Sequence, residues 1–270
     1  MTSTHSINKN LLKSHFDLQA PHYDHFGNLQ KKIADQLLLL IRTPLPGTPI
    51  LEIGTGTGYL SKAIFKKFYS TRLLSIDFSA QMLKMARRQF HEFQRLFFIQ
   101  ADGECLPFQG KFSALISSST FQWFTDLQNA LKNYYSLLCS QGCLYFTLFV
   151  EGTFQELIES FQIAYQKNGL KPVRPAPLYY NVGQIENYLT KNLFQIRLLE
   201  TVDEISIFPS FDELHYSIKK IGASHAPHKL NWLPKSVVKE SKKYYQDRFR
   251  IKEGGLKVTN RILYGVAERV

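Results

Sequence analysis

The feature that most constrains this chain of 270 residues is a short apolar run that ends in three closely spaced glycines. Residues 50–53 read Ile-Leu-Glu-Ile and lead into Gly54, Gly56 and Gly58, after which residues 59–68 have the apolar spacing of a helix. A buried strand, a glycine turn and a helix, in this order, open the nucleotide-binding α/β folds. We therefore expect a parallel sheet whose first turn approaches a ligand closely.

The rest of the chain alternates between strand-like and helix-like segments. This alternation predicts an α/β fold with a doubly wound, mostly parallel, seven-stranded sheet of the Rossmann-like kind. Residues 209–255 follow a strand-like segment with two helix-like stretches, so they predict a helical insertion before the last strand. Besides residues 50–53, the expected strands are residues 73–77, 96–100, 112–117, 142–150, 194–208 and 256–267. The expected helices are residues 10–40, 59–68, 79–90, 127–138, 153–167, 182–193, 211–221 and 235–249.

Composition excludes several classes of protein. Hydrophobic residues make up 44% of the chain and charged residues 20%, as in globular proteins with a core. No apolar stretch approaches the roughly 18 residues of a membrane span, and residues 1–13 lack the apolar region of an export signal, so we expect a cytoplasmic protein. The three cysteines form no CxxC pair, and His225 and His228 have no further ligands at suitable spacing, so no metal site is expected.

The formal net charge of +11 is concentrated late in the chain. Residues 219–257 contain 11 basic and 3 acidic side chains, which indicates an acidic partner, either nucleic acid or an acidic protein, unless the block is only a solvated face. One alternative is therefore an RNA-binding protein whose α/β domain has lost catalysis. Aromatic and basic side chains alternate over residues 242–250 in its favour. The intact glycine turn argues against it, and nucleic acid is not the favoured partner.

The glycine turn and several carboxylates define the expected ligand site. The spacing is G-x-G-x-G rather than the G-x-G-x-x-G of dinucleotide-binding loops, and Glu52 stands two residues before the first glycine. This arrangement suits a ligand whose amino-acid end approaches the glycine backbone. Asp77, at the end of the next strand, is placed to accept hydrogen bonds from both hydroxyls of a ribose. Asp102 and Gly103 follow the third strand, where we expect a contact to the amino group of an adenine.

In this order the motifs resemble those of class I S-adenosylmethionine-dependent methyltransferases. Other segments resemble one family among them, the malonyl-carrier-protein O-methyltransferases of biotin synthesis. The resemblance runs from about residue 10 to the C-terminus and is least diagnostic over residues 151–195. Pro21, which interrupts the first helix, and Gly103, where a larger residue is common, depart from the family pattern. The matching segments are Phe16-Asp17-x-x-Ala20-x-x-Tyr23-Asp24, Asp77-Phe78-Ser79-x-x-Met82-Leu83, Glu104-x-Leu106-Pro107-Phe108, Phe121-Gln122-Trp123, residues 218–225 and residues 256–266.

The resemblance implies transfer of the methyl group of S-adenosylmethionine to the free carboxylate of a malonyl thioester on acyl carrier protein. That carboxylate is ionised at pH 7, so no general base is needed. The catalytic residues implied are Tyr23, which closes the site, with Gln122 and Trp123. An arginine or a lysine is expected to hold the second carboxylate oxygen, and bidentate pairing favours arginine. The candidates for it are Arg174, Arg197, Arg248 and Arg250. The cofactor-binding residues implied are Glu52, Gly54, Gly56, Gly58, Asp77, Phe78, Met82, Asp102, Gly103 and Ser119.

The same resemblance implies four parts of the chain. Residues 1–45 form a helical lid, residues 46–208 the cofactor-binding core, residues 209–255 an insertion for substrate and carrier protein, and residues 256–270 the last strand. A methyltransferase of another small carboxylic acid or of a quinone precursor is the alternative enzyme, and it has no use for a basic insertion. The acidic carrier protein is expected to meet the insertion through Lys219, Lys220, Lys239, Lys242, Lys243, Arg248 and Arg250.

Overall fold

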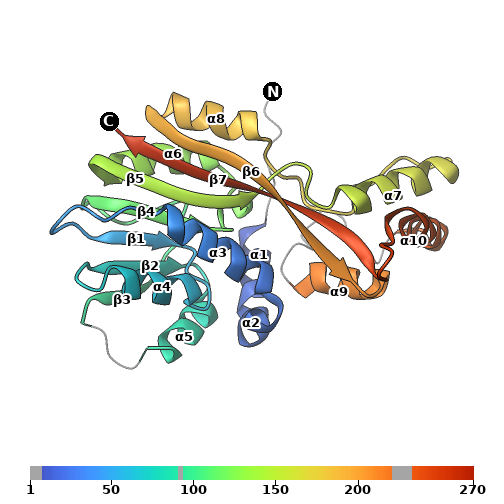
Figure 1. Cartoon of the computed structure of the whole chain (residues 1–270), viewed down its shortest axis with the longest axis horizontal. Helices are drawn as coiled ribbons and strands as arrows, with labels where there is room; N and C mark the ends of the chain where they lie inside the picture. The colour runs from blue at the N-terminus through green and yellow to red at the C-terminus, as the bar shows by residue number, and fades with distance from the viewer. Residues whose placement is uncertain (1–7, 91–93, 221–232) are drawn as a thin grey trace. The chain divides into compact units, whose positions relative to one another are not determined.

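The computed structural model describes residues 8–90, 94–220 and 233–270, and these form a seven-stranded mixed sheet (Figure 1). The strand order is β3-β2-β1-β4-β5-β7-β6, with β7 antiparallel to its neighbours, which confirms the predicted doubly wound class. Parallel pairing joins β3 to β2, β2 to β1, β1 to β4 and β4 to β5. The strands are β1 (Ile50–Ile53), β2 (Leu73–Asp77), β3 (Leu96–Gln100), β4 (Phe112–Ser118), β5 (Leu138–Phe149), β6 (Phe194–Phe208) and β7 (Leu256–Arg269).

The helices also follow the sequence prediction, with one difference at the N-terminus. The expected single helix over residues 10–40 is divided, because Pro21 lies in a 3₁₀ turn where the α-helical hydrogen-bond pattern stops. The N-terminal pieces are α1 (Lys9–Gln19), η1 (Ala20–His22), α2 (Tyr23–Phe26) and α3 (Asn28–Leu40). The others are α4 (Tyr59–Lys67), α5 (Ala80–Arg88), η2 (Phe121–Trp123), α6 (Leu127–Leu137), α7 (Gln155–Lys167), α8 (Val182–Lys191), α9 (Phe211–Lys220) and α10 (Lys235–Phe249).

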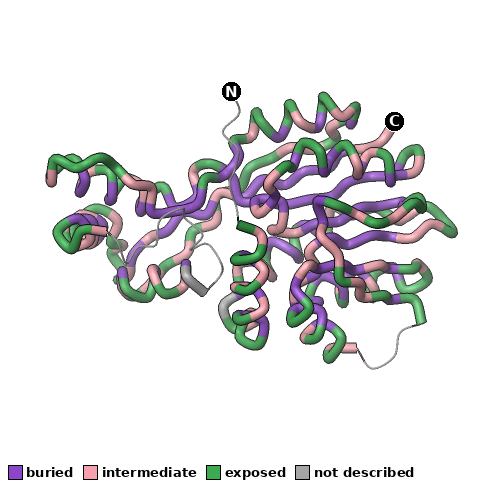
Figure 2. Tube along the Cα trace, turned by 180° about the vertical axis from the view of Figure 1, so that it is seen from behind, coloured by how far each residue is buried: buried purple, intermediate pink, exposed green. Residues whose placement is uncertain are grey.

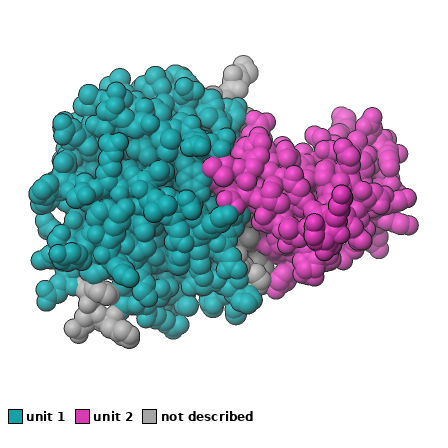
Figure 3. Space-filling model, viewed as in Figure 1, with its two compact units in different colours: residues 1–148, 180–201, 263–270 teal, residues 149–179, 202–262 magenta. Residues whose placement is uncertain are grey.

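Two compact units make up the described structure, and Figure 3 colours them separately. Unit 1 comprises residues 1–148, 180–201 and 263–270. The central strands of its sheet are largely buried (Figure 2), and β1 has no exposed residue. On one face, Leu37 of α3 and Ile64 of α4 pack against Ile50, Leu73 and Leu96. Removing water from these side chains stabilises the sheet and fixes the ends of its strands, where the functional residues lie.

Unit 2 comprises residues 149–179 and 202–262 and contains α7, α9 and α10. Here α7 packs against α10, and the buried Glu156 of α7 accepts hydrogen bonds from the backbone N and the hydroxyl of Thr259 at 3.0 and 2.5 Å. Tyr245 of α10 is fully buried and donates to the Lys257 carbonyl at 2.7 Å. The predicted helical insertion between the last two strands is thus present as α9 and α10.

Candidate active site

A pocket lies in unit 1 at the carboxyl ends of β1, β2, β3 and β4, which is where open α/β sheets bind ligands. Helix α1 and the segment that follows it supply part of its wall. The lining residues are Lys9, Leu12, Phe16, Tyr23, Ile53, Gly54, Gly56, Asp77, Phe78, Met82, Ala101, Asp102, Gly103, Glu104, Ser118, Ser119, Thr120, Trp123 and Phe124. Ten of the predicted site residues are therefore brought together. Glu52, Gly58 and Gln122 are the three that do not line it.

The glycine turn takes a conformation that requires its glycines. Gly54 has φ +77°, and a Cβ there would collide with the side chain of Thr120. Gly56 has φ +56° and lies on the pocket wall, yet no atom lies within 4 Å of where its Cβ would be. The backbone at Gly56 is therefore open to close approach by a ligand, which is the fit expected for the amino-acid end of S-adenosylmethionine. Gly58 is the N-cap residue of α4 and has φ +90°, a conformation that favours glycine at the start of this helix.

Glu52 stabilises this turn from beneath. Its carboxylate is buried and accepts hydrogen bonds from the hydroxyls of Thr55, Ser61 and Ser75 at 3.3, 2.5 and 2.7 Å. Burial raises the pKa of Glu52, and the three hydroxyls oppose that effect. The carboxylate thereby joins β1, β2 and α4. Glu52 also lines a smaller neighbouring pocket that shares Tyr23 and Gly54 with the first, and its contact with a cofactor stays a prediction.

Asp77 is held in one orientation by backbone donors. Its Oδ2 accepts from the N–H of Gly56 at 2.9 Å and its Oδ1 from the N–H of Ser79 at 2.8 Å. Ser79 then caps α5, as predicted, because its hydroxyl accepts from the Met82 N–H at 3.1 Å. Burial raises the pKa of Asp77 to about 6, the two backbone donors counteract this, and the nearby Asp17 adds to it. The carboxylate keeps lone pairs for a ligand, as a ribose-binding residue must.

Helix α1 covers the pocket through an aromatic cluster. Phe16 of α1 packs edge-on against Phe78 and Trp123, with ring centroids 5.9 and 6.0 Å apart, and Tyr23 lies at 6.4 Å. Asp17 adds a polar anchor, since it accepts a 2.5 Å hydrogen bond from the Ser79 hydroxyl at the start of α5. The residues of the expected lid are thus in contact with the residues expected to hold the cofactor.

A cationic contact that sequence reasoning missed closes the other end of α1. Lys9 Nζ lies 2.6 Å from Asp102 Oδ2 and 2.9 Å from Glu104 Oε1. Burial opposes the charge of Lys9, but its bonds to the two carboxylates outweigh that effect and raise its pKa. Glu104 is itself fixed, because it accepts from the backbone and the hydroxyl of Thr125. Asp102, predicted to meet the adenine, therefore holds Lys9 here, and its adenine contact stays a prediction.

Gly103 has a packing reason for its small size. A Cβ would lie 2.8 Å from Ile53 and 2.9 Å from Phe124, so a larger side chain does not fit. Its carbonyl accepts a 2.7 Å hydrogen bond from the buried hydroxyl of Tyr134 in α6. Helix α6 thus fixes the backbone just after β3, and Phe124 fills the space that a larger side chain at position 103 would need.

The three predicted catalytic residues occupy different surroundings. Tyr23 lines the pocket, and burial together with Asp77 and Asp24 raises its pKa, so its hydroxyl is protonated at neutral pH. Trp123 lines the pocket as well. Gln122 is only 4% exposed and donates to the carbonyl of Ser119 at 2.7 Å. Gln122 thus supports Ser119, whose φ of +53° turns the chain at the end of β4.

The predicted partner residues lie in unit 2. On α10, Lys239 and Lys243 are exposed one turn apart, whereas Lys242 forms a 2.7 Å ion pair with Asp212. Arg248 and Arg250 are exposed. Lys219 and Lys220 end α9, and their side chains lie outside the described part of the chain, as do residues 221–225 of the family-like segment and His228.

The four candidate arginines differ in burial and in the partners of their side chains. Arg197, in unit 1, donates to Glu268 at 2.8 Å, so its charge is already paired. Arg174, in unit 2, is half-buried, and its Nε donates to the Pro177 carbonyl at 3.2 Å. Burial lowers the pKa of Arg174, which identifies a desolvated guanidinium, and within the described residues it forms no ion pair. Such a group is poised for an anionic ligand.

Other kinds of site are absent from the part of the chain that the structure describes. No group of three or more His, Cys, Asp or Glu side chains is arranged to hold a metal ion in residues 8–90, 94–220 and 233–270. Over the same ranges, no helix combines the length and apolar character needed to cross a membrane.

The chain is similar to known proteins in its domain family, in its sequence and in its fold. A family model described as a methyltransferase domain matches residues 50–142. A malonyl-[acyl-carrier protein] O-methyltransferase from Priestia megaterium is 34% identical over 263 residues, which are 94% of this chain and 95% of the relative. The protein of the same description from Bacillus cereus is 31% identical over 92% of this chain and 93% of its own length. The crystal structure of geranyl diphosphate C-methyltransferase from Streptomyces coelicolor has a TM-score of 0.53 at 14% identity, over 88% of this chain and 78% of that one, and it shares the fold.

Proposed function

This chain belongs to the family of malonyl-[acyl-carrier protein] O-methyltransferases, and we propose from that premise that it methylates the free carboxylate of malonyl-carrier protein, a step of biotin precursor synthesis. It is an S-adenosylmethionine-dependent methyltransferase. The length of the sequence match supports malonyl-carrier protein as the substrate. Identity of 34% extends over 94% of the chain, far beyond the methyltransferase domain of residues 50–142.

We assign the cofactor to the pocket of unit 1. The open backbone at Gly56 faces the amino-acid end, Asp77 accepts the ribose hydroxyls, and Phe78 and Met82 pack beside the adenine. The hydroxyl of Ser119 supports this assignment, because it is a buried atom on the pocket wall without a hydrogen-bond partner among the described residues. A polar group left in that state is costly unless a ligand satisfies it.

The proposed chemistry needs orientation more than proton transfer. When bound, the cofactor supplies an electrophilic methyl group on a sulfonium. A malonate half-ester or thioester is ionised at pH 7, so the attacking oxygen is available without a base. Alignment of such reactants lowers the activation barrier by up to roughly 7–11 kcal/mol. Trp123 and Tyr23, packed with Phe16 of α1, exclude water from the region where the oxygen must lose its hydration shell.

We propose that an arginine holds the second carboxylate oxygen, and Arg174 differs from the other three candidates in its burial and pairing. A guanidinium pairs with a carboxylate through two parallel hydrogen bonds, and burial strengthens such a pair. Arg174 is half-buried and lacks an ion pair among the described carboxylates, whereas Arg197 is engaged by Glu268 and Arg248 and Arg250 are exposed to solvent. The charge of Glu151 favours the protonated form of Arg174, so this guanidinium stays cationic although it is partly desolvated.

The carrier protein is proposed to approach α10. The acidic surface of the carrier protein is expected to be attracted to Lys239 and Lys243, which are exposed on one face of α10. Lys242, already paired with Asp212 at 2.7 Å, has little charge left to offer. The three lysines therefore provide a matched set in which two are expected to steer the partner and one is not.

Mass spectrometry of malonyl-carrier protein incubated with the enzyme and S-adenosylmethionine tests the function. The malonyl group is expected to gain the mass of one CH₂, removable by an esterase. Arg174→Gln should raise KM for both malonyl-carrier protein and malonyl-coenzyme A. Lys239→Glu with Lys243→Glu should raise KM for the carrier protein alone, and Lys242→Ala should change neither. A methylated quinone precursor or another small acid, with malonyl thioesters untouched, would establish the alternative enzyme.

A further inference from the structure

The edge of the sheet formed by β2 and β3 has unequal faces. On one face, Leu96 and Phe98 pack with helices α3 and α4, and α5 also contacts both strands. On the other face, Phe97 and Ile99 of β3 point away from these helices, since successive side chains of a strand alternate. The chain passes from β3 to β4 through residues 101–111, which form turns and loop and no helix. A crossover helix that would cover this second face is thus missing from the connection.

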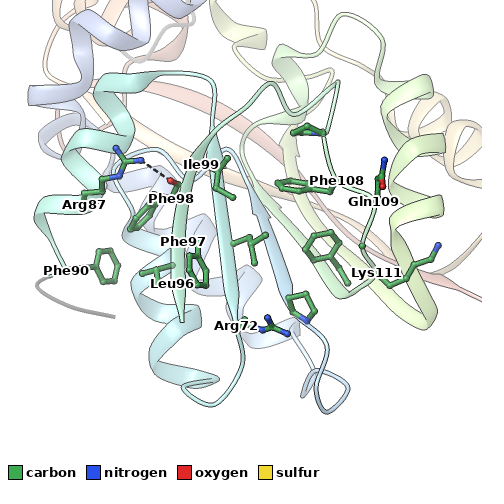
Figure 4. A pocket seen from close by; sticks show the side chains of 15 residues that line it. Arg72, Arg87, Phe90, Leu96, Phe97, Phe98, Ile99, Phe108, Gln109 and Lys111 are labelled. Carbon is green, nitrogen blue, oxygen red and sulfur yellow. Dashed lines mark hydrogen bonds between the residues drawn. The ribbon is translucent and has the colours of Figure 1, made fainter. Parts of the chain in front are cut away.

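The second face and the free edge of β3 form an apolar groove, shown in Figure 4, which Leu96 and Phe98 of the first face also line. Leu74, Phe97 and Ile99 form its floor on β2 and β3, and Phe108 and Phe112 form one wall. Phe97 is 45% exposed and lies on β3, the edge strand of the sheet. Parallel sheets are usually covered on both faces, so this uncovered apolar face is a candidate docking surface. The groove shares no lining residue with the cofactor pocket.

The charged residues that line the groove in the described part of the chain are all basic. Arg72, Arg87 and Lys111 stand at its rim, and no described lining residue is an aspartate or glutamate. Arg87 donates to the carbonyl of Phe98 at 2.9 Å and Lys111 donates to the carbonyl of Ser136, so neutral backbone oxygens hold these cations in place. None of the three forms an ion pair with a carboxylate of the described residues. The rim therefore attracts a negatively charged partner.

We propose that this groove binds an acidic amphipathic helix of a partner protein, which takes the position of the missing crossover helix. An apolar stripe would pack on Phe97 and Leu74, and flanking carboxylates would meet Arg72 and Lys111. Strand β3 has five residues, so the groove is about 16 Å long and fits roughly three turns of helix. A second copy of this chain is a poor occupant, because two faces that both carry basic rims repel each other.

Fluorescence anisotropy with a labelled helical peptide tests this proposal. The peptide has about 15 residues, with leucines three and four positions apart and glutamates on both flanks. We expect it to bind the full-length enzyme, and a version with lysines in place of the glutamates to bind at least about tenfold more weakly. Phe97→Ser and Arg72→Glu should each weaken binding of the acidic peptide about tenfold. The peptide should leave the affinity for S-adenosylmethionine unchanged, since the two sites share no residue.

Two control variants distinguish binding in the groove from nonspecific electrostatic or hydrophobic binding elsewhere on the surface. Leu39→Ser removes an apolar side chain of α3 that is 73% exposed, and Lys62→Glu reverses an exposed charge on α4. Both should bind the peptide like the unmodified enzyme, and thermal unfolding shows that all four variants are folded. Binding that Phe97→Ser and Arg72→Glu leave intact overturns the proposal, as does absence of binding. Sedimentation that shows a dimer abolished by Phe97→Ser also overturns it, in favour of a second copy.

Discussion

Because the pKa of Asp77 is raised, we expect the affinity for S-adenosylmethionine to depend on pH. Asp77 is 7% exposed, and burial raises its pKa to about 6 although Gly56 and Ser79 donate to it. At pH 5 only about one molecule in eleven then carries an ionised Asp77, against about ten in eleven at pH 7. If ribose hydroxyls donate to the ionised form, the affinity for S-adenosylmethionine falls about tenfold from pH 7 to pH 5, or about 1.4 kcal/mol.

Stability of the free protein should change in the opposite direction. Between the ordinary pKa of 3.8 and the folded value of about 6, the folded state binds a proton that the unfolded state has released. The free energy of unfolding therefore decreases as pH rises through this window, by an amount approaching about 3 kcal/mol for a shift of about two units. Ligand binding and folding thus respond to the same proton with opposite signs.

Isothermal titration calorimetry between pH 5 and pH 7, on the enzyme and on Asp77→Asn, tests both statements together with urea unfolding. At pH 7 the variant should bind S-adenosylmethionine about tenfold or more weakly, because ligand hydroxyls lose an anionic acceptor, and its affinity should no longer vary with pH. Glu52→Gln is the control, since burial also raises the pKa of Glu52. A pH dependence that persists in Asp77→Asn but disappears in Glu52→Gln would refute the assignment of the proton to Asp77.

Two further predictions concern the lid and the glycine turn. Phe16→Ala removes the ring that packs on Trp123, so it should loosen the packing of α1 and weaken cofactor affinity. In a Trp232→Phe background, the fluorescence of Trp123 should shift to longer wavelength. An unchanged spectrum would contradict this packing of α1 on the pocket. Gly54→Ala should abolish cofactor binding, because the added methyl group collides with Thr120. Gly47 has a similar φ of +75°, but no atom lies within 4 Å of its Cβ position, so Gly47→Ala should bind the cofactor normally. Titration calorimetry distinguishes the two variants.

Local chemistry allowed the sequence to predict most of the sheet and one end of the site. The strand at residues 73–77 has the expected bounds because its apolar run ends at a polar residue, and Ser79 caps the next helix with its own hydroxyl. Strand β5 begins at Leu138 rather than at residue 142. The polar residues before Gly142 join the strand because Gln141 takes φ +64° and the register shifts between Phe112 and Ala114. Such a bulge depends on the partner strand, so the segment alone does not reveal it.

The interactions that sequence reasoning missed join distant parts of the chain. Lys9 and Asp102 are 93 residues apart, and nothing in the polar N-terminal segment distinguishes Lys9 from its neighbour Lys13. Glu52 was predicted as a cofactor contact from its place before the turn, but its carboxylate direction depends on Ser61 and Ser75 from two other elements. The identity of a polar residue indicates what it is able to bind, and tertiary contacts decide which partner it takes.

The N-terminal segment is part of the proposed cofactor pocket, although the match to the methyltransferase domain begins at residue 50. Lys9, Phe16 and Tyr23 all line that pocket, and Lys9 binds the carboxylate of Asp102 that is proposed to meet the adenine. Any ligand contact with Asp102 must therefore share it with Lys9 or displace it. We therefore expect docking of α1 and binding of the cofactor to be coupled through this carboxylate, and thermodynamic linkage then requires each to change the other's free energy by the same amount. Through this contact the N-terminal segment is expected to tune the affinity of a site whose fold is common to many methyltransferases.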